Sequence, residues 1–364
     1  MYITVIFLVL FVFAFLELFT KFGKNNSMCH NALFFFLLLF FFMSFLRWER
    51  GTDWGSYYSF FRYLNLYKGG EYEYGFTLLN KIVALFGDYT MMLFVQACIF
   101  YILMYKCLIK FSLVPLFSLM ILFVICNYAG IFFVRQTIAM SLTTFSLFYI
   151  QEKKFLKFLI ILLLAASIHV SALAFLISYF IFYKYYSFKR LFIILLVLAS
   201  VGIVFTAYVM PMFSSELRIF MKVSGYLEEG MDSDIGGMSS VLLYCRGVAS
   251  RLFSLLIISY IVKDTRQHDS FCNGLFNIYF VGMCIYLFLG AMNQTLARLA
   301  IGFELVQIFL YPYIVCHYWF KNRLILFFLI SAYFFSRVVA PGPYTNLFVP
   351  YKSVFNKELN VEIG

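Results

Sequence analysis

The chain has 364 residues, of which 64% are hydrophobic and only 12% are charged, and its mean hydropathy is +0.91. Soluble domains are about 45–50% apolar and about 25% charged, so this composition excludes an ordinary soluble protein. The formal net charge of +11 could suggest a nucleic-acid partner, but the basic residues are scattered over short connections and form no continuous stripe. We therefore expect no nucleic-acid binding, and we interpret the Lys and Arg residues as topology signals and anion contacts.

Continuously apolar runs of about 17–22 residues recur along the chain, which is the length that a helix needs to cross a bilayer. A transmembrane barrel would instead show short strands of alternating polarity. We predict an all-α polytopic membrane protein that forms a single transmembrane domain over residues 1–364, with about twelve spanning helices. The expected spans cover residues 2–20, 31–47, 90–109, 113–130, 134–151, 155–168, 170–184, 191–210, 239–262, 271–291, 298–318 and 323–339.

Lys residues in the short connections orient these predicted helices, because short cytoplasmic loops are enriched in Lys and Arg. Lys21 and Lys24 follow the first span, which places that connection in the cytoplasm and the N-terminus outside. Residues 48–89 and residues 211–238 then form two larger periplasmic loops. We expect amphipathic or re-entrant helices at the membrane interface within the first of these loops.

Four groups of polar residues lie at helix ends on the predicted outer side. They are Arg47, Glu49, Arg50 and Asp53 after the second span, Arg135 and Gln136 at the start of the fifth, His169 between the sixth and seventh, and Arg298 at the start of the eleventh. Ionisable residues at membrane depth are costly and are often functional. Because the arginine side chain matches a phosphate with a planar fork of donors, the outer arginines indicate a bound anion.

Each group also has a structural interpretation. The arginines of the first group can be anchors in the headgroup layer, with Asp53 as a helix cap or as their ion-pair partner. His169 can be a structural residue in a turn, and Arg298 can pair with Glu304, one to two turns away. Arg135 is harder to explain as an anchor, because it lies within a long apolar stretch.

The residues of these groups resemble those of a known family. The shared elements are Arg47-x-x-x-Gly51-Thr52-Asp53-Trp54-x-x-Tyr57, Val134-Arg135-Gln136-x-x-Ala139, Ser167-x-His169-x-Ser171-Ala172 and the closing Val349-Pro350-Tyr351-Lys352. In this order, and over nearly the whole chain, they are similar to the EpsG/Wzy-type polysaccharide polymerases.

The resemblance implies a multi-pass glycosyltransferase of the bacterial inner membrane, with a GT-C-like helical bundle and an active site that faces the periplasm. Such enzymes join undecaprenyl-diphosphate-linked repeat units of O-antigen or exopolysaccharide. The implied partners are the lipid-linked glycans and membrane lipid, with a chain-length regulator and other polysaccharide-assembly proteins as further candidates. No cofactor is expected. No metal site is expected either, since the Asp-x-Asp pattern at residues 232–234 lies in a late Gly-rich loop.

The outer polar residues fit the chemistry of such a substrate, which is a diphosphate on a long polyprenyl chain. Candidate diphosphate-binding residues are Arg47, Arg50, Arg135 and Arg298, and candidate sugar-binding residues are Trp48, Trp54, Tyr57 and Gln136. Donors aimed at the departing diphosphate would stabilise the transition state more than the ground state. Attack by an acceptor hydroxyl needs a general base, for which Asp53 and His169 are both candidates.

Three other functions of polytopic membrane proteins fit this sequence less well. An O-antigen ligase would need an outer loop that binds lipopolysaccharide, and residues 211–238 form a short one. A flippase or other transporter of lipid-linked oligosaccharides predicts internal repeats and charges that lead to both sides, whereas no repeat is evident here. A membrane acyltransferase would need a catalytic His near the first arginine group.

Overall fold

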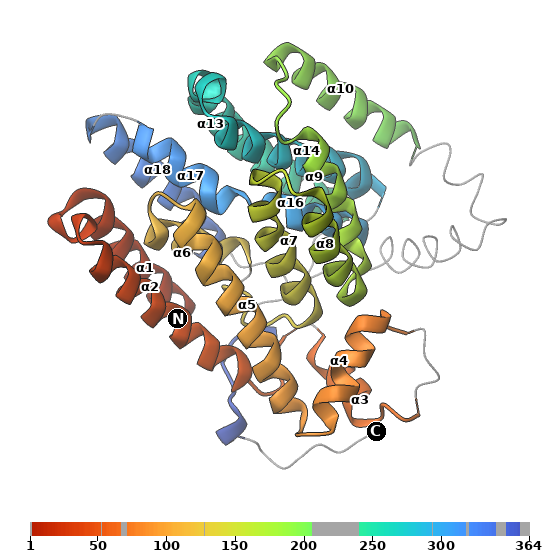
Figure 1. Ribbon diagram of the computed structural model, residues 1–364. Coiled ribbons are helices and arrows are strands. Elements are labelled where there is room, and N and C mark those ends of the chain that lie inside the picture. The colour runs from red at the N-terminus through yellow and green to blue at the C-terminus, as the bar shows by residue number, and fades with distance from the viewer. Residues whose placement is uncertain are drawn as a thin grey trace. The chain divides into compact units, whose positions relative to one another are not determined.

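The structure is a computed structural model that describes residues 2–51, 53–66, 71–126, 128–205, 240–292, 294–317, 320–339 and 347–356. The chain divides into two compact units, one of Met1–Leu173 with Tyr311–Gly364 and one of Ala174–Leu310. Regular structure in the described residues is helical, with one isolated β-bridge (Figure 1). The predicted loop at residues 211–238 and Thr52 of the first motif lie outside the described residues.

The first unit contains the helices that precede residue 174 and the C-terminal helix. Their bounds are α1 Tyr2–Phe19, η1 Lys21–Lys24, α2 Asn26–Phe45, α3 Trp54–Arg62, α4 Tyr74–Ala84, α5 Tyr89–Phe111, α6 Pro115–Ile125, α7 Arg135–Gln151, α8 Phe155–Ile168, α18 Phe320–Val339 and η6 Val354–Asn356. Helix α5 packs against α2 and α7, and α8 packs against α7 and α4. The short helices α3 and α4 confirm that the first long connection is partly helical.

The second unit is also helical, and two elements extend across the boundary between the units. The elements of the second unit are α9 Leu176–Ile181, α10 Phe188–Val204, α13 Ser240–His268, α14 Ser270–Met292, α15 Gln294–Ala297, η4 Arg298–Ala300 and α16 Ile301–Glu304, and the two that cross the boundary are η2 Val170–Phe175 and α17 Gln307–His317. Helix α14 is the centre of this unit, since α10, α13 and α16 all pack against it.

Six segments among the described residues are long and apolar enough to span a membrane. They are Tyr2–Phe19, Asn26–Phe45, Tyr89–Phe111, Ser270–Gly290, Arg298–His317 and Asn322–Val339. The prediction of an all-helical membrane protein is therefore confirmed. The count of about twelve spans and the periplasmic side of the two loops stay predictions.

Apolar patterning overestimates the helix that leads toward Arg135. The sequence predicts a span over residues 113–130, but α6 ends earlier, before a turn in which three successive residues have left-handed backbone conformations. The φ angles of Tyr128, Ala129 and Gly130 are 67°, 56° and 74°. Such angles are incompatible with a right-handed helix, so the helix cannot continue through this turn although the surrounding sequence is mostly apolar.

The C-terminal segment returns to the motif that follows α2. The backbone N–H of Trp48 donates to the carbonyl oxygen of Lys352 over 2.9 Å, and that of Gly51 donates to Leu347 over 3.0 Å. Gly51 has a φ of 118°, and a Cβ atom there would lie 2.5 Å from the carbonyl oxygen of Phe132. Glycine is thus required at this position by both conformation and space, and the first and last motifs form one local structure.

Candidate functional site

Glu73, Arg135 and His169 meet in the first unit. Glu73 directly precedes α4, Arg135 is the first residue of α7, and His169 directly follows α8. Nη1 of Arg135 donates to Oε2 of Glu73 over 2.6 Å, and Nδ1 of His169 lies 3.3 Å from Oε1 of Glu73. The Glu73, Arg135 and His169 side chains are 19%, 20% and 24% exposed. The cluster is therefore sheltered but still accessible from outside the protein.

The Glu73 carboxylate is held by a third group as well. The backbone N–H of Val170 donates to Oε1 of Glu73 over 2.9 Å. Burial by itself raises the pKa of Glu73, but the hydrogen bonds from His169 and Val170, together with the Arg135 charge, outweigh it and lower this pKa to about 2. Glu73 is therefore ionised at neutral pH, and both of its oxygens act as hydrogen-bond acceptors.

Two tyrosine rings flank the Arg135 guanidinium. Its Cζ atom lies 5.0 Å from the centroid of the Tyr72 ring and 5.9 Å from that of the Tyr57 ring, which is within the range of a cation–π interaction. Burial raises the pKa of the Tyr57 phenol, the Arg135 charge opposes this rise, and the Asp53 charge adds to it. Asp53 and Arg135 thus lie within electrostatic reach of the same tyrosine.

Gly75 allows α4 to approach the end of α8. A Cβ atom at Gly75 would lie 2.2 Å from Oγ of Ser167 and 2.8 Å from its carbonyl oxygen, both closer than non-bonded atoms can approach. A larger residue would push the start of α4 away from α8 and would separate Glu73 from His169. Ser167 belongs to the same motif as His169. A second residue of this motif therefore helps to position the cluster, because the small Ser167 side chain packs against Gly75.

The predicted sugar-binding aromatic residues also belong to the first unit. Trp48, Trp54 and Tyr57 are only 7%, 8% and 7% exposed. The Trp48 and Trp54 rings pack edge to face, with their centroids 4.8 Å apart, so each covers part of the other. Tyr57 faces Arg135, and Gln136 is half-buried at the start of α7. Tyr57 and Gln136 are thus the predicted sugar contacts that the structure places beside the cluster.

Arg47 is held in a buried polar network. Its side chain is fully buried, and Nη1 donates to the carbonyl oxygen of Ser44 over 2.9 Å and to that of Ile131. The network continues through the Ser44 hydroxyl to Gln96, whose amide donates to the Thr137 hydroxyl over 3.1 Å. Arg47 thus links the end of α2 to the segment before α7, and in this structure its side chain is closed to a ligand.

The remaining predicted residues are placed as follows. Arg50 is half-buried, and Asp53 precedes α3 without a side-chain capping hydrogen bond. Arg298 is exposed at the start of η4, in the second unit. The structural alternative in which Arg298 pairs with Glu304 is not what the structure shows, because Glu304 pairs with Arg251.

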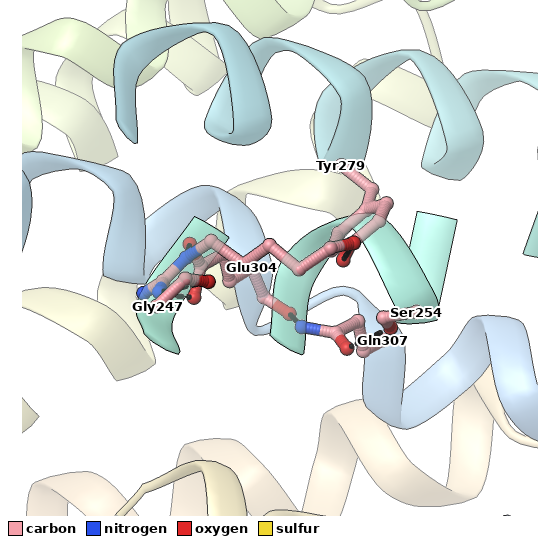
Figure 2. A network of polar contacts seen from close by, with 6 residues as sticks. Gly247, Ser254, Tyr279, Glu304 and Gln307 are labelled. Atoms are coloured by element: carbon pink, nitrogen blue, oxygen red, sulfur yellow. Dashed lines mark hydrogen bonds and ion pairs between the residues drawn. The ribbon is translucent and has the colours of Figure 1, made fainter. Parts of the chain in front are cut away.

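A second polar cluster lies within the second unit, where α13 faces α14 and the segment that contains α16 (Figure 2). Nε and Nη2 of Arg251 donate to the two carboxylate oxygens of Glu304, and Cζ of Arg251 lies 3.4 Å from the centroid of the Tyr286 ring. One turn further along α13, the Ser254 hydroxyl donates to the Gln307 side-chain oxygen over 2.9 Å. Both carboxylate oxygens of Glu304 accept from the Arg251 guanidinium, so this ion pair joins α16 to α13.

Sequence reasoning did not single out Glu73. It lies in a Tyr- and Gly-rich connection close to Glu71, where no motif distinguishes it from an exposed acidic loop residue. A signal was nevertheless present, because an arginine within an apolar stretch needs a counter-charge. A search for the partner of Arg135 among the few acidic residues of the first long connection would have included Glu73.

The cluster offers groups for anion binding and for proton transfer. Glu73 engages Nη1 of Arg135, and the other N–H groups of a guanidinium can bind a phosphate at the same time. His169 contributes a ring nitrogen that can accept or donate a proton. Within the described residues, no group of three or more His, Cys, Asp or Glu side chains is placed to hold a metal ion.

The described residues form a helical protein with segments able to span a membrane, and its first unit holds a sheltered cluster of charged side chains. Residues 30–353 match the model of the EpsG family, a range that contains Glu73, Arg135 and His169. The chain belongs to this family, which is the exopolysaccharide and O-antigen polymerase family. Comparisons with curated proteins and with solved structures find no match.

Proposed function

We propose that this protein is a glycosyltransferase that polymerises polysaccharide from oligosaccharide repeat units linked to undecaprenyl diphosphate. The reaction would take place at the periplasmic face of a bacterial inner membrane and would extend O-antigen or exopolysaccharide. Family membership supports the class of reaction. The observation that carries the assignment to this site is the contact of Arg135 with Glu73, and through Glu73 with His169, at a position open to a ligand.

In the proposed reaction, a hydroxyl oxygen of the acceptor unit attacks the anomeric carbon of the donor glycan. The bond between this carbon and the diphosphate oxygen breaks, the lipid diphosphate leaves with the electron pair, and the hydroxyl proton passes to a base. Arg135 binds the diphosphate and stabilises the charge that develops on it. Because this charge grows toward the transition state, the interaction contributes to kcat as well as to binding.

The geometry favours His169 over Asp53 as the general base. His169 shares the partner Glu73 with the proposed diphosphate-binding residue Arg135, whereas Asp53 precedes α3 and acts on this region through the Tyr57 phenol. A base must lie within hydrogen-bond reach of the attacking hydroxyl, and in this proposal the acceptor binds against the cluster that contains His169. In this proposal Asp53 orients the acceptor or stabilises positive charge at the anomeric carbon.

The flanking tyrosine rings provide surfaces for sugars next to the diphosphate, and Gln136 offers an amide to sugar hydroxyls. Arg50 stays a candidate contact to the diphosphate, and the role of Arg298, in the second unit, stays a prediction from the sequence. Arg47, Trp48 and Trp54 are buried in this structure, and in the proposed arrangement they pack behind the residues that contact the substrate. A chain-length regulator and other polysaccharide-assembly proteins are the proposed partners.

The function can be tested by electrophoresis of surface glycan from a strain in which this chain is deleted, with and without the restored protein. A polymerase predicts a ladder of many repeat units with the protein, and a core that carries a single repeat unit without it. A deletion strain that loses every repeat unit from the core would contradict the proposal and would point to a ligase or a flippase.

A further inference from the structure

We propose that Glu73 is a positioning residue of this reaction, which orients the imidazole of His169 so that Nε2 can accept the proton of the acceptor hydroxyl. This inference rests on the proposed function and extends it to a residue outside all of the predicted motifs. It turns a pair of candidate residues into a three-membered unit with Glu73 at its centre.

The two oxygens of Glu73 have separate tasks. Oε2 accepts from Nη1 of Arg135 over 2.6 Å, while Oε1 accepts from the backbone N–H of Val170 over 2.9 Å and lies 3.3 Å from Nδ1 of His169. A carboxylate is a rigid planar group, so one side chain sets the distance between the anion-binding residue and the base. Holding catalytic groups at a fixed separation lowers the entropy cost of bringing them to the reacting atoms.

The charge of Glu73 determines which nitrogen of His169 carries the proton. With its pKa lowered to about 2, Glu73 is an acceptor only, so the Nδ1 atom beside it must be the donor. A neutral imidazole carries one proton, and with Nδ1 protonated the lone pair lies on Nε2. The carboxylate thus selects the ring form in which the nitrogen away from Glu73 can act as a base, and it stabilises the imidazolium that forms on proton transfer.

The backbone around Glu73 keeps this arrangement in place. Glu73 precedes α4, whose start is held against α8 by the close approach of Gly75 to Ser167. His169 ends α8, and its backbone N–H donates to the carbonyl oxygen of Ala165 over 2.9 Å. Both partners are therefore attached to helix ends in direct contact, which is how a precise distance between side chains is maintained.

The test uses purified full-length protein in liposomes, with lipid-diphosphate-linked repeat units as substrate, and compares Glu73→Ala, Glu73→Gln, His169→Ala and the Glu73→Ala/His169→Ala double variant. Glu71→Gln is the matched control, because Glu71 is exposed in the same connection. We expect kcat to fall about 100-fold in Glu73→Ala, with KM for the lipid-linked substrate changed by less than about threefold. Glu73→Gln keeps an oxygen acceptor without the charge and should lie between Glu73→Ala and the wild type.

The double variant distinguishes positioning from a general structural role. If Glu73 acts through His169, removing both residues should lower kcat no further than His169→Ala alone, because groups that act as a unit are not additive. Losses that multiply, or a loss that is confined to KM, would overturn the inference. If Glu73→Ala fails to fold, as judged by gel filtration, Glu73→Gln decides instead: a wild-type kcat in that variant overturns the inference, and a reduced kcat at unchanged KM supports it.

The same experiment separates a failure of this inference from a failure of the proposed function. Wild-type protein that makes no polymer under any condition would remove the proposed function itself. Wild-type polymerisation that is lost in His169→Ala but intact in Glu73→Ala and Glu73→Gln would remove only the positioning role of Glu73.

Discussion

Arg47 and Arg135 are arginines at helix ends of the same unit, and their surroundings differ in two respects. Arg47 is fully buried and donates to backbone carbonyl oxygens. Arg135 is 20% exposed and contacts a carboxylate, with two tyrosine rings beside it. A buried guanidinium that donates to carbonyl oxygens contributes to stability and cannot reach a ligand. An accessible guanidinium can bind an anion in addition to its carboxylate partner. Partner type and access therefore separate a structural arginine from a candidate ligand-binding one.

The largest effect is expected at Arg135. Arg135→Ala should lower the rate of polymerisation by a factor on the order of 100 or more, because the developing charge on the diphosphate loses its donor. Arg135→Lys should also be impaired, since an ammonium group cannot make the bidentate contact. The measurement is the initial rate in liposomes, with thermal unfolding as the control for folding. Wild-type polymer length in Arg135→Ala would remove Arg135 from the site.

A smaller loss is expected when the cluster is deformed without altering its members. Gly75→Ala places a Cβ atom 2.2 Å from the Ser167 hydroxyl, and the resulting shift of α4 should lower the polymerisation rate about 10- to 100-fold. Gly55→Ala is the matched control, because Gly55 is likewise the second residue of its helix and a Cβ atom there meets nothing within 4 Å. Equal rates for the two variants would contradict the importance of the Gly75 contact.

Substitution of Arg47 should affect stability more than catalysis. Arg47→Ala removes the guanidinium donor from the carbonyl oxygens of Ser44 and Ile131, and leaves Ile131 with the 3.4 Å bond from the Ser44 hydroxyl. The loss of a hydrogen bond to a charged group costs about 1.5–3 kcal/mol. We expect a lower melting temperature in detergent and a rate per folded molecule within about threefold of the wild type. A stable Arg47→Ala protein that makes no polymer would contradict a purely structural role for Arg47.

The smallest effect is expected from acid. The pKa of Glu73 is lowered from 4.5 to about 2, so its stabilising contribution is complete above the unfolded value and is lost as the pH falls through the folded one. The difference in melting temperature between the wild type and Glu73→Gln should therefore be constant above about pH 5 and should shrink as the pH falls from 4.5 toward 2. A difference that grows with falling pH would show that Glu73 is not held as an ionised acceptor.

Most helices could be predicted from the sequence, as could two members of the cluster. Arg135 stands out because it is charged within an apolar stretch, and His169 because it lies between two apolar helices. Glu73 could not be identified in this way, since an acid in a polar connection has no local signature. The ion pair of Arg251 with Glu304 was missed for a similar reason, because the nearer Arg298 is the obvious partner along the chain but not in space.

The sequence by itself determined that this protein is a bundle of membrane helices and that it belongs to its family. Apolar runs and short motifs are local properties, and the bilayer forces a long apolar run to become a helix. Only the tertiary structure decided which polar residues meet. Glu73 is 62 residues from Arg135 and 96 residues from His169, and they come together because α4 packs against α8 at a glycine that has no side chain to keep the two helices apart.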